Sequence, residues 1–366
     1  MHLGFFTMPI HPLQKEWRRS LAEDREAFIL ADRLGLTEAY VGEHSTDQAE
    51  NITSCMAFVA SLAHETKSIR LGTGTVNLPN AHPAAVAATI AMLDHMLDGR
   101  FNFGISPGGL LSDAEVFGNL DKNRTEMFVE SIDMILALWR GEPPYDLRGK
   151  YWEISTARTQ IPEIGQGVLP KPLQGPHPPI VVTAVAPHSK GLMSAAARGW
   201  SPISANFLLP KWVATHWPMY AEGCRQANLT PDPSQWRVAR SVFVADDLRT
   251  AKEYVFGPDS PYRYYYKQIL AKMQRGGRSS LFKEDPAIPD DQVTVDGVLE
   301  KLVTWGTVDK VTEDLLAFRE TVGDFGTLLY AGKDWADPVL SRRSMELMAN
   351  KVMPAVNRAI PASKCA

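Results

Sequence analysis

Short apolar runs alternate along the chain with longer segments in which apolar residues recur every three or four positions. Residues 3–6 form one such run, and from about residue 16 to residue 34 apolar residues such as Phe28 and Ala31 recur with helical spacing before Gly35. The run predicts a strand, and the spacing predicts a helix that ends at the glycine.

The same unit of a strand and a helix repeats. Further strands are expected at 38–42, 69–75, 101–105, 180–184, 201–205, 237–245 and 327–330, and further helices at 56–63, 84–97, 192–197, 212–227 and 311–322. Strands joined by helices run parallel, and this number of them favours a closed (β/α)8 TIM barrel, an α/β fold, over an open doubly wound sheet. No GxGxxG motif follows a predicted strand, which also argues against a Rossmann fold. We therefore expect one barrel domain over residues 1–366.

Two segments interrupt the alternation. Residues from about 142 to 179 are rich in proline and glycine and predict an excursion from the barrel. Residues from about 246 to 310 combine an aromatic cluster, a basic stretch and an acidic one, a composition that suits a mobile lid. A disordered surface loop without a role is the alternative for this second segment.

Composition narrows the class of protein. With 45% apolar residues the chain has enough hydrophobic side chains for a large core. Its net charge of −4, without a block of like charges, argues against a nucleic-acid or membrane-surface binder. The three cysteines, Cys55, Cys224 and Cys365, offer no paired framework, and neither a signal peptide nor a long apolar span is recognisable. These features predict a cytoplasmic protein that acts on a small molecule.

In a barrel of this type the reactive groups gather where the strands end, at one face. Three histidines, His44, His82 and His188, follow predicted strands. No HxH, HExxH or cysteine pair accompanies them, so no metal is expected, and Ser106 lacks the GxSxG spacing of a serine hydrolase. The ordinary pKa of histidine suits His44 for proton transfer beside a flat redox cofactor. A purely structural role for His44 is the alternative.

The predicted strand at 180–184 runs into the sequence APHSKG and then a helix. Ser189 and free backbone N–H groups would there lie at a helix N-terminus, which binds anions such as the phosphate of a cofactor. An N-cap without a ligand is the alternative role for Ser189.

Three segments resemble a known family. The stretch LGTGTVNLPNAHPAAVAATIAMLDHMLDGRFNFGISPGGLLSDAEVFG, the stretch TAVAPHSKGLMSAAARG and the terminal MELMANKVMPAV are similar to the bacterial luciferase α-subunit and to luciferase-like flavin monooxygenases of the limonene and diketocamphane types. The resemblance runs from Gly4 to about Pro354. It implies a TIM barrel that takes reduced FMN (FMNH2) from a separate NAD(P)H:flavin reductase, and O2 as co-substrate. Through a flavin C4a-hydroperoxide such enzymes insert one oxygen atom by hydroxylation, Baeyer–Villiger insertion or aldehyde oxidation.

The resemblance also assigns residues on the cofactor side of the expected site. His44 matches the catalytic histidine near the reactive edge of the flavin, and Gly74-Thr75 matches a non-proline cis peptide against the isoalloxazine. Ser106 stands where luciferase has a reactive cysteine, and Pro107 stands where luciferase has an arginine that pairs with the flavin phosphate.

The proline removes one anchoring charge from the expected phosphate site. Ser189 with the N–H groups around His188, Arg124 or Lys190 could compensate for it, and Ser189 aligns with the phosphate loop of the family.

The resemblance places a substrate pocket over the flavin. Phe6, Met8, Phe207 and Trp212 would line it, with Leu208 and the region of Tyr264, and they predict a small hydrophobic substrate. Helices at 53–63 and 84–97, which make the dimer face in the family, predict a homodimer.

Two other functions fit the same fold. A deazaflavin (F420)-dependent dehydrogenase would transfer hydride, but its longer cofactor tail calls for several basic residues, and the strand-end loops offer only Lys190. A non-catalytic flavin-binding relative would need neither the Glu43-His44 pair nor a long lid.

Overall fold

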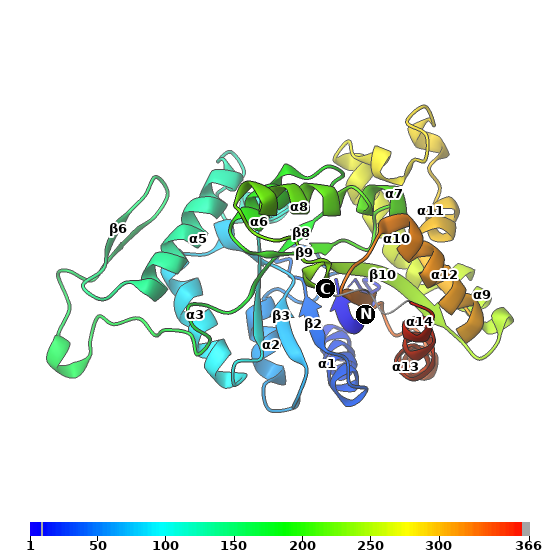
Figure 1. The fold of residues 1–366 in the computed structure, drawn as a ribbon, viewed down its shortest axis with the longest axis horizontal. Helices are drawn as coiled ribbons and strands as arrows, with labels where there is room; N and C mark the ends of the chain where they lie inside the picture. Colours follow the sequence, from blue (N-terminus) through cyan, green and yellow to red (C-terminus); the bar gives the residue numbers. More distant parts are fainter. Residues whose placement is uncertain (9, 361–366) are drawn as a thin grey trace. The chain divides into compact units, whose positions relative to one another are not determined.

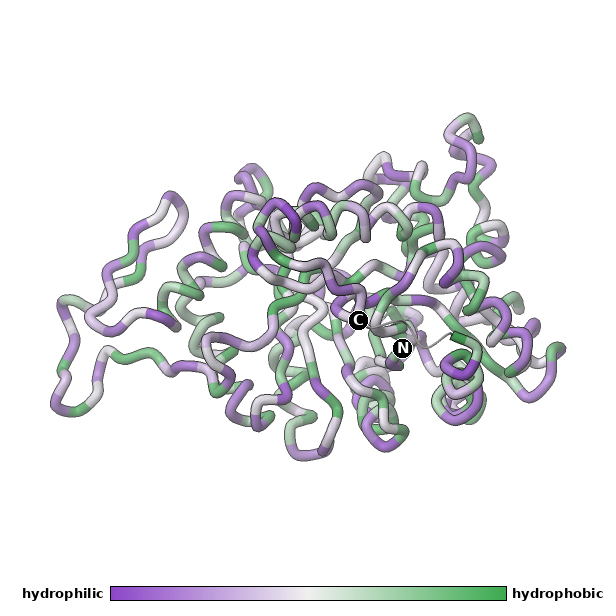
Figure 2. The backbone as a smooth tube through the Cα atoms, viewed as in Figure 1, coloured by the Kyte–Doolittle hydropathy of each residue, from purple (hydrophilic) through white to green (hydrophobic). Residues whose placement is uncertain are grey.

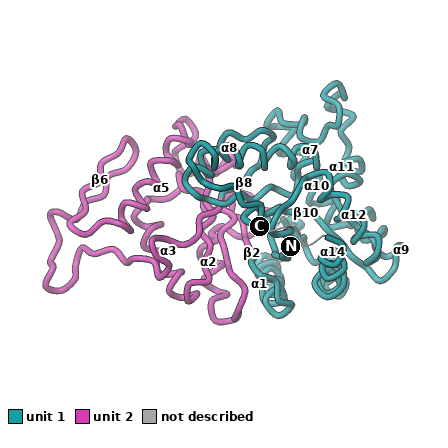
Figure 3. Tube along the Cα trace, in the orientation of Figure 1, with its two compact units in different colours: residues 1–39, 182–366 teal, residues 40–181 magenta. Residues whose placement is uncertain are grey.

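The structure is a computed structural model that describes residues 1–8 and 10–360. Contacts between Cα atoms divide it into two compact units, residues 1–39 with 182–366 and residues 40–181 (Figure 3). Cys365 lies outside the described residues.

The strands and helices alternate along most of the chain (Figure 1). The strands are β1 (His2–Thr7), β2 (Glu38–Val41), β3 (Arg70–Thr73), β4 (Val76–Asn77), β5 (Phe101–Ser106), β6 (Asp146–Arg148), β7 (Glu153–Ser155), β8 (Ile180–Ala184), β9 (Ser201–Ser204), β10 (Arg237–Val244), β11 (Val303–Gly306) and β12 (Thr327–Ala331). The helices are α1 (Trp17–Arg33), α2 (Cys55–Leu62), α3 (Pro83–Met96), α4 (Leu111–Val116), α5 (Arg124–Arg140), α6 (Lys190–Ala197), α7 (Pro210–Val213), α8 (His216–Gln226), α9 (Leu248–Phe256), α10 (Pro261–Arg275), α11 (Val295–Leu302), α12 (Val308–Val322), α13 (Pro338–Leu347) and α14 (Met353–Ala359), with a π-helical turn at Met348–Val352.

The sheet closes on itself. Its strands follow the order β12-β1-β2-β3-β5-β8-β9, and β10 pairs with both β9 and β12. The closed order of eight strands confirms the expected (β/α)8 barrel. β1 and β12 are parallel, with Leu3 opposite Leu328 and Phe6 opposite Ala331. β11 pairs with the second half of β10 and lies outside the ring.

The expected strands are found where the apolar runs lie, but several helices were not expected. Helix α5 begins at an asparagine cap, because the side chain of Asn123 accepts a hydrogen bond from the backbone N–H of Glu126. Its buried residues Met127, Ile135 and Leu138 recur with helical spacing. The helix expected at 212–227 is divided into α7 and α8.

The excursion at 142–179 contains the β6–β7 hairpin, which extends beyond α5 in Figure 1. Hydrophobic residues lie among hydrophilic ones along it (Figure 2). Glu130 of α5 fastens the hairpin, since its carboxylate accepts hydrogen bonds from the backbone N–H groups of Lys150, Tyr151 and Trp152. A side chain at Gly149 would collide with the same carboxylate.

The segment at 246–310 is folded into α9, α10, α11 and β11, so its interpretation as a disordered loop is wrong. The aromatic cluster explains the order, because three of its four tyrosines are buried. Tyr262 donates to the carbonyl oxygen of Val242 at 2.6 Å, and the hydroxyl of Tyr266 lies 2.8 Å from that of Ser241. The tyrosines of α10 therefore form part of the core of the first unit.

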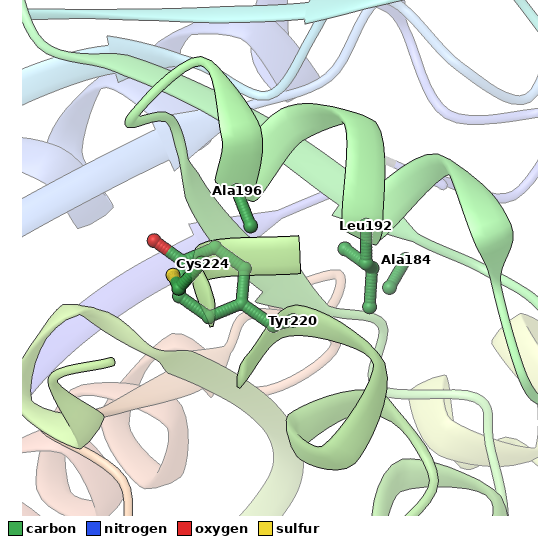
Figure 4. Close-up of a cluster of buried hydrophobic side chains, with 5 residues drawn as sticks. All are labelled: Ala184, Leu192, Ala196, Tyr220 and Cys224. Carbon is green, nitrogen blue, oxygen red and sulfur yellow. The ribbon is translucent and has the colours of Figure 1, made fainter. Parts of the chain in front are cut away.

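Another part of that core lies behind β8 (Figure 4). Ala184 at the end of the strand packs with Leu192 and Ala196 of α6 and with Tyr220 and Cys224 of α8. This packing fixes the start of α6, where the strand-end loop with Ser189 enters the helix.

Candidate functional site

The imidazole of His44 lies between two carboxylates of the second unit, at the end of β2. Its Nδ1 is 3.3 Å from Oδ2 of Asp113, and its Nε2 is 3.7 Å from Oε2 of Glu50. The side chain of His44 keeps 13% of its surface exposed, whereas both carboxylates are buried. The sequence predicted His44, and it missed both acidic partners.

Asp113 is held in its ionised form. Burial by itself raises the pKa of this carboxyl, but hydrogen bonds from His44, from Thr46 and from the backbone of Ser45 lower it to about 2. The backbone N–H of Thr46 donates at 2.9 Å and its hydroxyl at 2.6 Å. An ionised Asp113 favours a hydrogen atom on Nδ1 of His44, which leaves Nε2 for proton exchange.

Replacing Asp113 with asparagine is expected to reduce the free energy of unfolding by up to about 2 kcal/mol at pH 7. The lowered pKa means that the stabilisation is present above the ordinary value near 4 and is lost as the pH falls through about 2. Urea unfolding of both proteins between pH 3 and pH 7 measures the difference. A constant difference across this range would contradict the assigned charge.

Glu43, the neighbour of His44, faces a different environment. Its carboxylate accepts hydrogen bonds from the backbone N–H and the thiol of Cys55, each at 2.9 Å, and from the backbone N–H of Asn77 at 3.1 Å. Burial raises the pKa of Glu43 in spite of these bonds, and burial raises that of the Cys55 thiol well above its usual range. Glu43 therefore ties the end of β2 to α2 and β4, and Cys55 stays a protonated thiol.

The peptide bond between Gly74 and Thr75 is cis, as the resemblance implied. Thr75 donates its hydroxyl hydrogen to Oγ of Ser106 at 2.7 Å, and Ser106 donates to Oδ1 of Asn77 at 2.9 Å. Ser106 also accepts from the backbone N–H of Gly108 at 3.2 Å. A chain of neutral polar groups thus joins the ends of β3, β4 and β5.

His188, Ser189 and Lys190, expected at the phosphate, lie in the first unit. His188 has a φ of +50°, and its backbone N–H donates to the hydroxyl of Thr215 at 2.9 Å. Ser189 is the N-cap of α6, and its side chain makes no capping hydrogen bond. Nearby, the ring nitrogens of His216 lie 2.9 Å from the carbonyl oxygen of Ala186 and 2.8 Å from Oγ of Ser204. Burial lowers the pKa of His216 to about 4, so a neutral His216 holds this loop.

The residues expected at the substrate differ in exposure. Phe6 is 8% exposed on β1, Met8 follows that strand, and Phe207 and Trp212 are half-buried. Within the described ranges, the buried indole Nε1 of Trp212 has no hydrogen-bond partner. Leu208 is fully buried and belongs to the core.

The polar groups beside the cis peptide are the hydroxyls of Thr75 and Ser106 and the amide of Asn77. Such groups can hydrogen-bond to the nitrogen and oxygen atoms of an isoalloxazine. In residues 1–8 and 10–360, no three His, Cys, Asp or Glu side chains are grouped as metal ligands.

The described helices also include none long and apolar enough to cross a membrane. The side chain of Arg124, considered for the phosphate, donates to the carbonyl oxygen of Gly108.

Known proteins are similar to this chain over most or part of its length. The 4-hydroxyprotoasukamycin monooxygenase of Streptomyces nodosus subsp. asukaensis is 32% identical over 97% of this chain and 92% of its own length. The oxygenase component of the flavin-dependent trigonelline monooxygenase of Acinetobacter baylyi is 35% identical over 44% of this chain and 42% of its own.

A solved structure covers nearly the whole molecule. The oxygenating constituent of 3,6-diketocamphane monooxygenase from Pseudomonas putida, a type II Baeyer–Villiger monooxygenase in complex with FMN, has a TM-score of 0.85 and 27% identity over 97% of this chain and 98% of its own. The sequence pattern of the family described as luciferase-like monooxygenase matches residues 1–324. This chain therefore belongs to the luciferase-like monooxygenase family.

Proposed function

We propose that this chain is the oxygenase component of a two-component monooxygenase. It would bind FMNH2 supplied by a separate NAD(P)H:flavin reductase and transfer one atom of O2 to a small hydrophobic substrate, while the other atom leaves as water. The observation that carries the proposal is the imidazole of His44, half-enclosed between Asp113 and Glu50 at the end of a barrel strand. The family, and relatives that are named as flavin or FMN enzymes, support it.

The cofactor, when bound, supplies the two electrons that activate O2. We propose that Gly74 and Thr75 lie against the isoalloxazine and that Ser106, fixed by Thr75 and Asn77, hydrogen-bonds beside it. His44 would give or take a proton at Nε2, because Asp113 holds its Nδ1 side. For the phosphate, we propose Ser189 and the backbone around His188. The hydroxyl of Ser189, the N-cap of α6, makes no hydrogen bond to its own helix.

We propose further that Phe6, Met8, Phe207 and Trp212 select the substrate. These side chains are apolar, and the indole N–H of Trp212 is one buried donor that a carbonyl or hydroxyl group could satisfy. This combination suits a hydrophobic substrate with a single polar group. We also propose a cytoplasmic location, where the free buried thiols of Cys55 and Cys224 stay reduced.

A homodimer through α2 and α3 belongs to the same proposal. On α3, Met92 keeps 55% of its surface exposed and Met96 keeps 37%, while Ala85 lies exposed about two turns before Met92 and about three turns before Met96. Exposed apolar and small residues along one helix suit close packing against a second copy.

We expect light scattering to give twice the chain mass for the wild type and the monomer mass for Met92→Lys, since the substitution buries a charge in the contact. A substitution on the exposed face of another helix, Arg249→Ala, is the control. A monomeric wild-type protein at micromolar concentration would exclude the dimer.

Cofactor use can be tested without knowing the substrate. Photoreduced FMN and reduced deazaflavin are titrated into the protein under anaerobic conditions, and each mixture is then combined with oxygenated buffer in a stopped-flow instrument. The proposal expects tight binding of FMNH2 and a rate of flavin oxidation that differs from that of free FMNH2. Binding of the reduced deazaflavin alone, with no reaction with O2, would replace the monooxygenase by a dehydrogenase.

A further inference from the structure

A buried histidine outside the proposed catalytic group has carboxylates at both ring nitrogens. In the first unit, Nδ1 of His11 is 2.5 Å from Oδ1 of Asp334, and Nε2 is 2.9 Å from Oδ2 of Asp24. All three side chains are less than a tenth exposed. An ionised carboxylate can only accept hydrogen bonds, so two protons are needed for the two contacts. A neutral imidazole carries one proton and would leave one pair of oxygen and nitrogen lone pairs facing each other.

Other charges complete the cluster. Nζ of Lys15 lies 2.6 Å from the Asp334 oxygen and also contacts Glu23, which in turn pairs with Arg19 at 3.1 Å. The carboxylates of Asp24 and Glu23 come from α1, and that of Asp334 follows β12. The cluster thus holds three carboxylates close to His11 and Lys15, and a positive charge on His11 offsets the excess of negative charge.

The cluster joins two loops that leave neighbouring strands at the same end. Of the loop between β1 and α1 the structure describes Met8 and residues 10–16, and residues 332–337 connect β12 to α13. The backbone N–H of Gly332 donates to the carbonyl oxygen of Phe6 at 2.7 Å, so the loops start side by side. Met8 precedes His11 by three residues in the first loop, and its carbonyl oxygen accepts from the backbone N–H of Ile10.

We propose that His11 is a doubly protonated positioning residue that clamps the β1–α1 loop, and Met8 with it, onto Asp334 of the β12–α13 loop. The inference rests on the proposed function insofar as Met8 lines the substrate site. Its chemical part, a buried imidazolium between Asp24 and Asp334, stands on the geometry alone. The clamp would fix the shape of the substrate side of the site without taking part in the reaction.

The electrostatics of the cluster have two opposing parts, because burial raises the pKa of Asp24 in spite of its hydrogen bond to His11. Burial alone would lower the pKa of His11, but hydrogen bonds and charges from Asp24 and Asp334 raise it to about 9. The stabilisation is therefore fully present below the ordinary value near 6.5 and is lost as the pH rises through about 9. Lys333, next to Asp334, has the opposite effect, because burial lowers its pKa to about 7. The pH dependence of the stability of the wild type would combine the effects of His11 and Lys333. The effect of His11 is therefore measured as a difference in stability between the wild type and its variants.

Nuclear magnetic resonance of protein labelled with 15N-histidine tests the charge directly and does not depend on activity. We expect one histidine whose two ring nitrogens both keep the chemical shifts of an imidazolium at pH 8. Its signals should persist in His44→Asn and disappear in His11→Gln. In Asp24→Asn, the same signals should titrate at a lower pH. The proposal would be overturned if no histidine other than His44 had two protonated ring nitrogens in the wild type at pH 8. This outcome can be read even if His11→Gln does not fold.

Kinetics test the positioning role. Once a substrate is found, His11→Gln and Asp24→Asn are expected to raise its KM about tenfold or more with kcat within about twofold, since the loop with Met8 is loosened and the reacting groups are untouched. His64→Gln, an exposed histidine after α2, should leave both constants unchanged. A fall in kcat of about tenfold or more with no change in KM would refute the positioning role. Failure of all variants and of the wild type to oxygenate any substrate would instead refute the proposed function, while the spectra would still decide the charge of His11.

Discussion

Replacing His44 with asparagine is expected to reduce substrate oxygenation by about 10²-fold or more, the usual contribution of a general acid or base. Asparagine can still hydrogen-bond to Asp113, so the loop that Asp113 holds through Ser45 and Thr46 should remain in place. The affinity for FMNH2 should therefore stay within about twofold, because the lost group is the proton donor and not a binding contact. FMNH2 would still reduce O2, but the oxygen would be released as hydrogen peroxide and would not be transferred to the substrate.

The measurement is the ratio of product formed to FMNH2 oxidised, together with anaerobic binding of FMNH2. His64→Gln serves as the control, since this exposed histidine lies away from the strand ends. Full coupling in His44→Asn would remove the histidine from the chemistry. A loss of FMNH2 binding in parallel with product would assign His44 to the cofactor site.

Gly104→Ala is expected to prevent stable folding. A Cβ atom at Gly104 would lie 1.8 Å from the carbonyl oxygen of Thr73, and that oxygen belongs to the backbone of the neighbouring strand. The strand cannot move aside easily, because the hydroxyl of Thr73 bonds to both the N–H and the carbonyl oxygen of Gly104, at 2.9 and 2.8 Å. Overpacking of this kind commonly costs about 1–3 kcal/mol, and a backbone collision should exceed that range.

Gly109→Ala is the matched control. It follows the same strand, and a Cβ atom there would meet no atom within 4 Å. Thermal unfolding should show a control close to the wild type and a Gly104→Ala protein that is insoluble or melts far below it. A Gly104→Ala protein with the melting temperature of the wild type would show that β3 and β5 can separate without loss of the barrel.

The eight strands of the barrel could be located from the sequence because they are short, mostly apolar runs. Tyr40 and Val41 of β2, for example, are completely buried. Helix α5 was missed although Met127, Ile135 and Leu138 carry a helical period, since its start is marked only by a short polar side chain, Asn123. The tyrosines at 262–266 were assigned to a lid from the composition of their segment. Composition does not distinguish a buried layer of aromatic side chains from an exposed lid.

The candidate site was only partly predictable for a different reason. His44 and Ser106 follow predicted strands, Gly74 and Thr75 are the last two residues of another, and the barrel brings strand ends together. Asp113 is 69 residues away from His44 in the sequence, and it reaches the imidazole only because α4 folds back over the end of β2. No local pattern marks Glu50 or Asp113 as partners of a histidine. The pairing of His11 with Asp334 is more distant still, at 323 residues.

This chain is expected to insert one atom of O2 into an organic substrate. The most direct test is a reaction with FMN, NADH, a flavin reductase and 18O2, in which a panel of terpenoid ketones, alkenes and phenols is examined by mass spectrometry. We expect at least one product that carries a single 18O atom, formed only when both the reductase and this chain are present. Products that carry no 18O, or that form equally with the reductase alone, would contradict it.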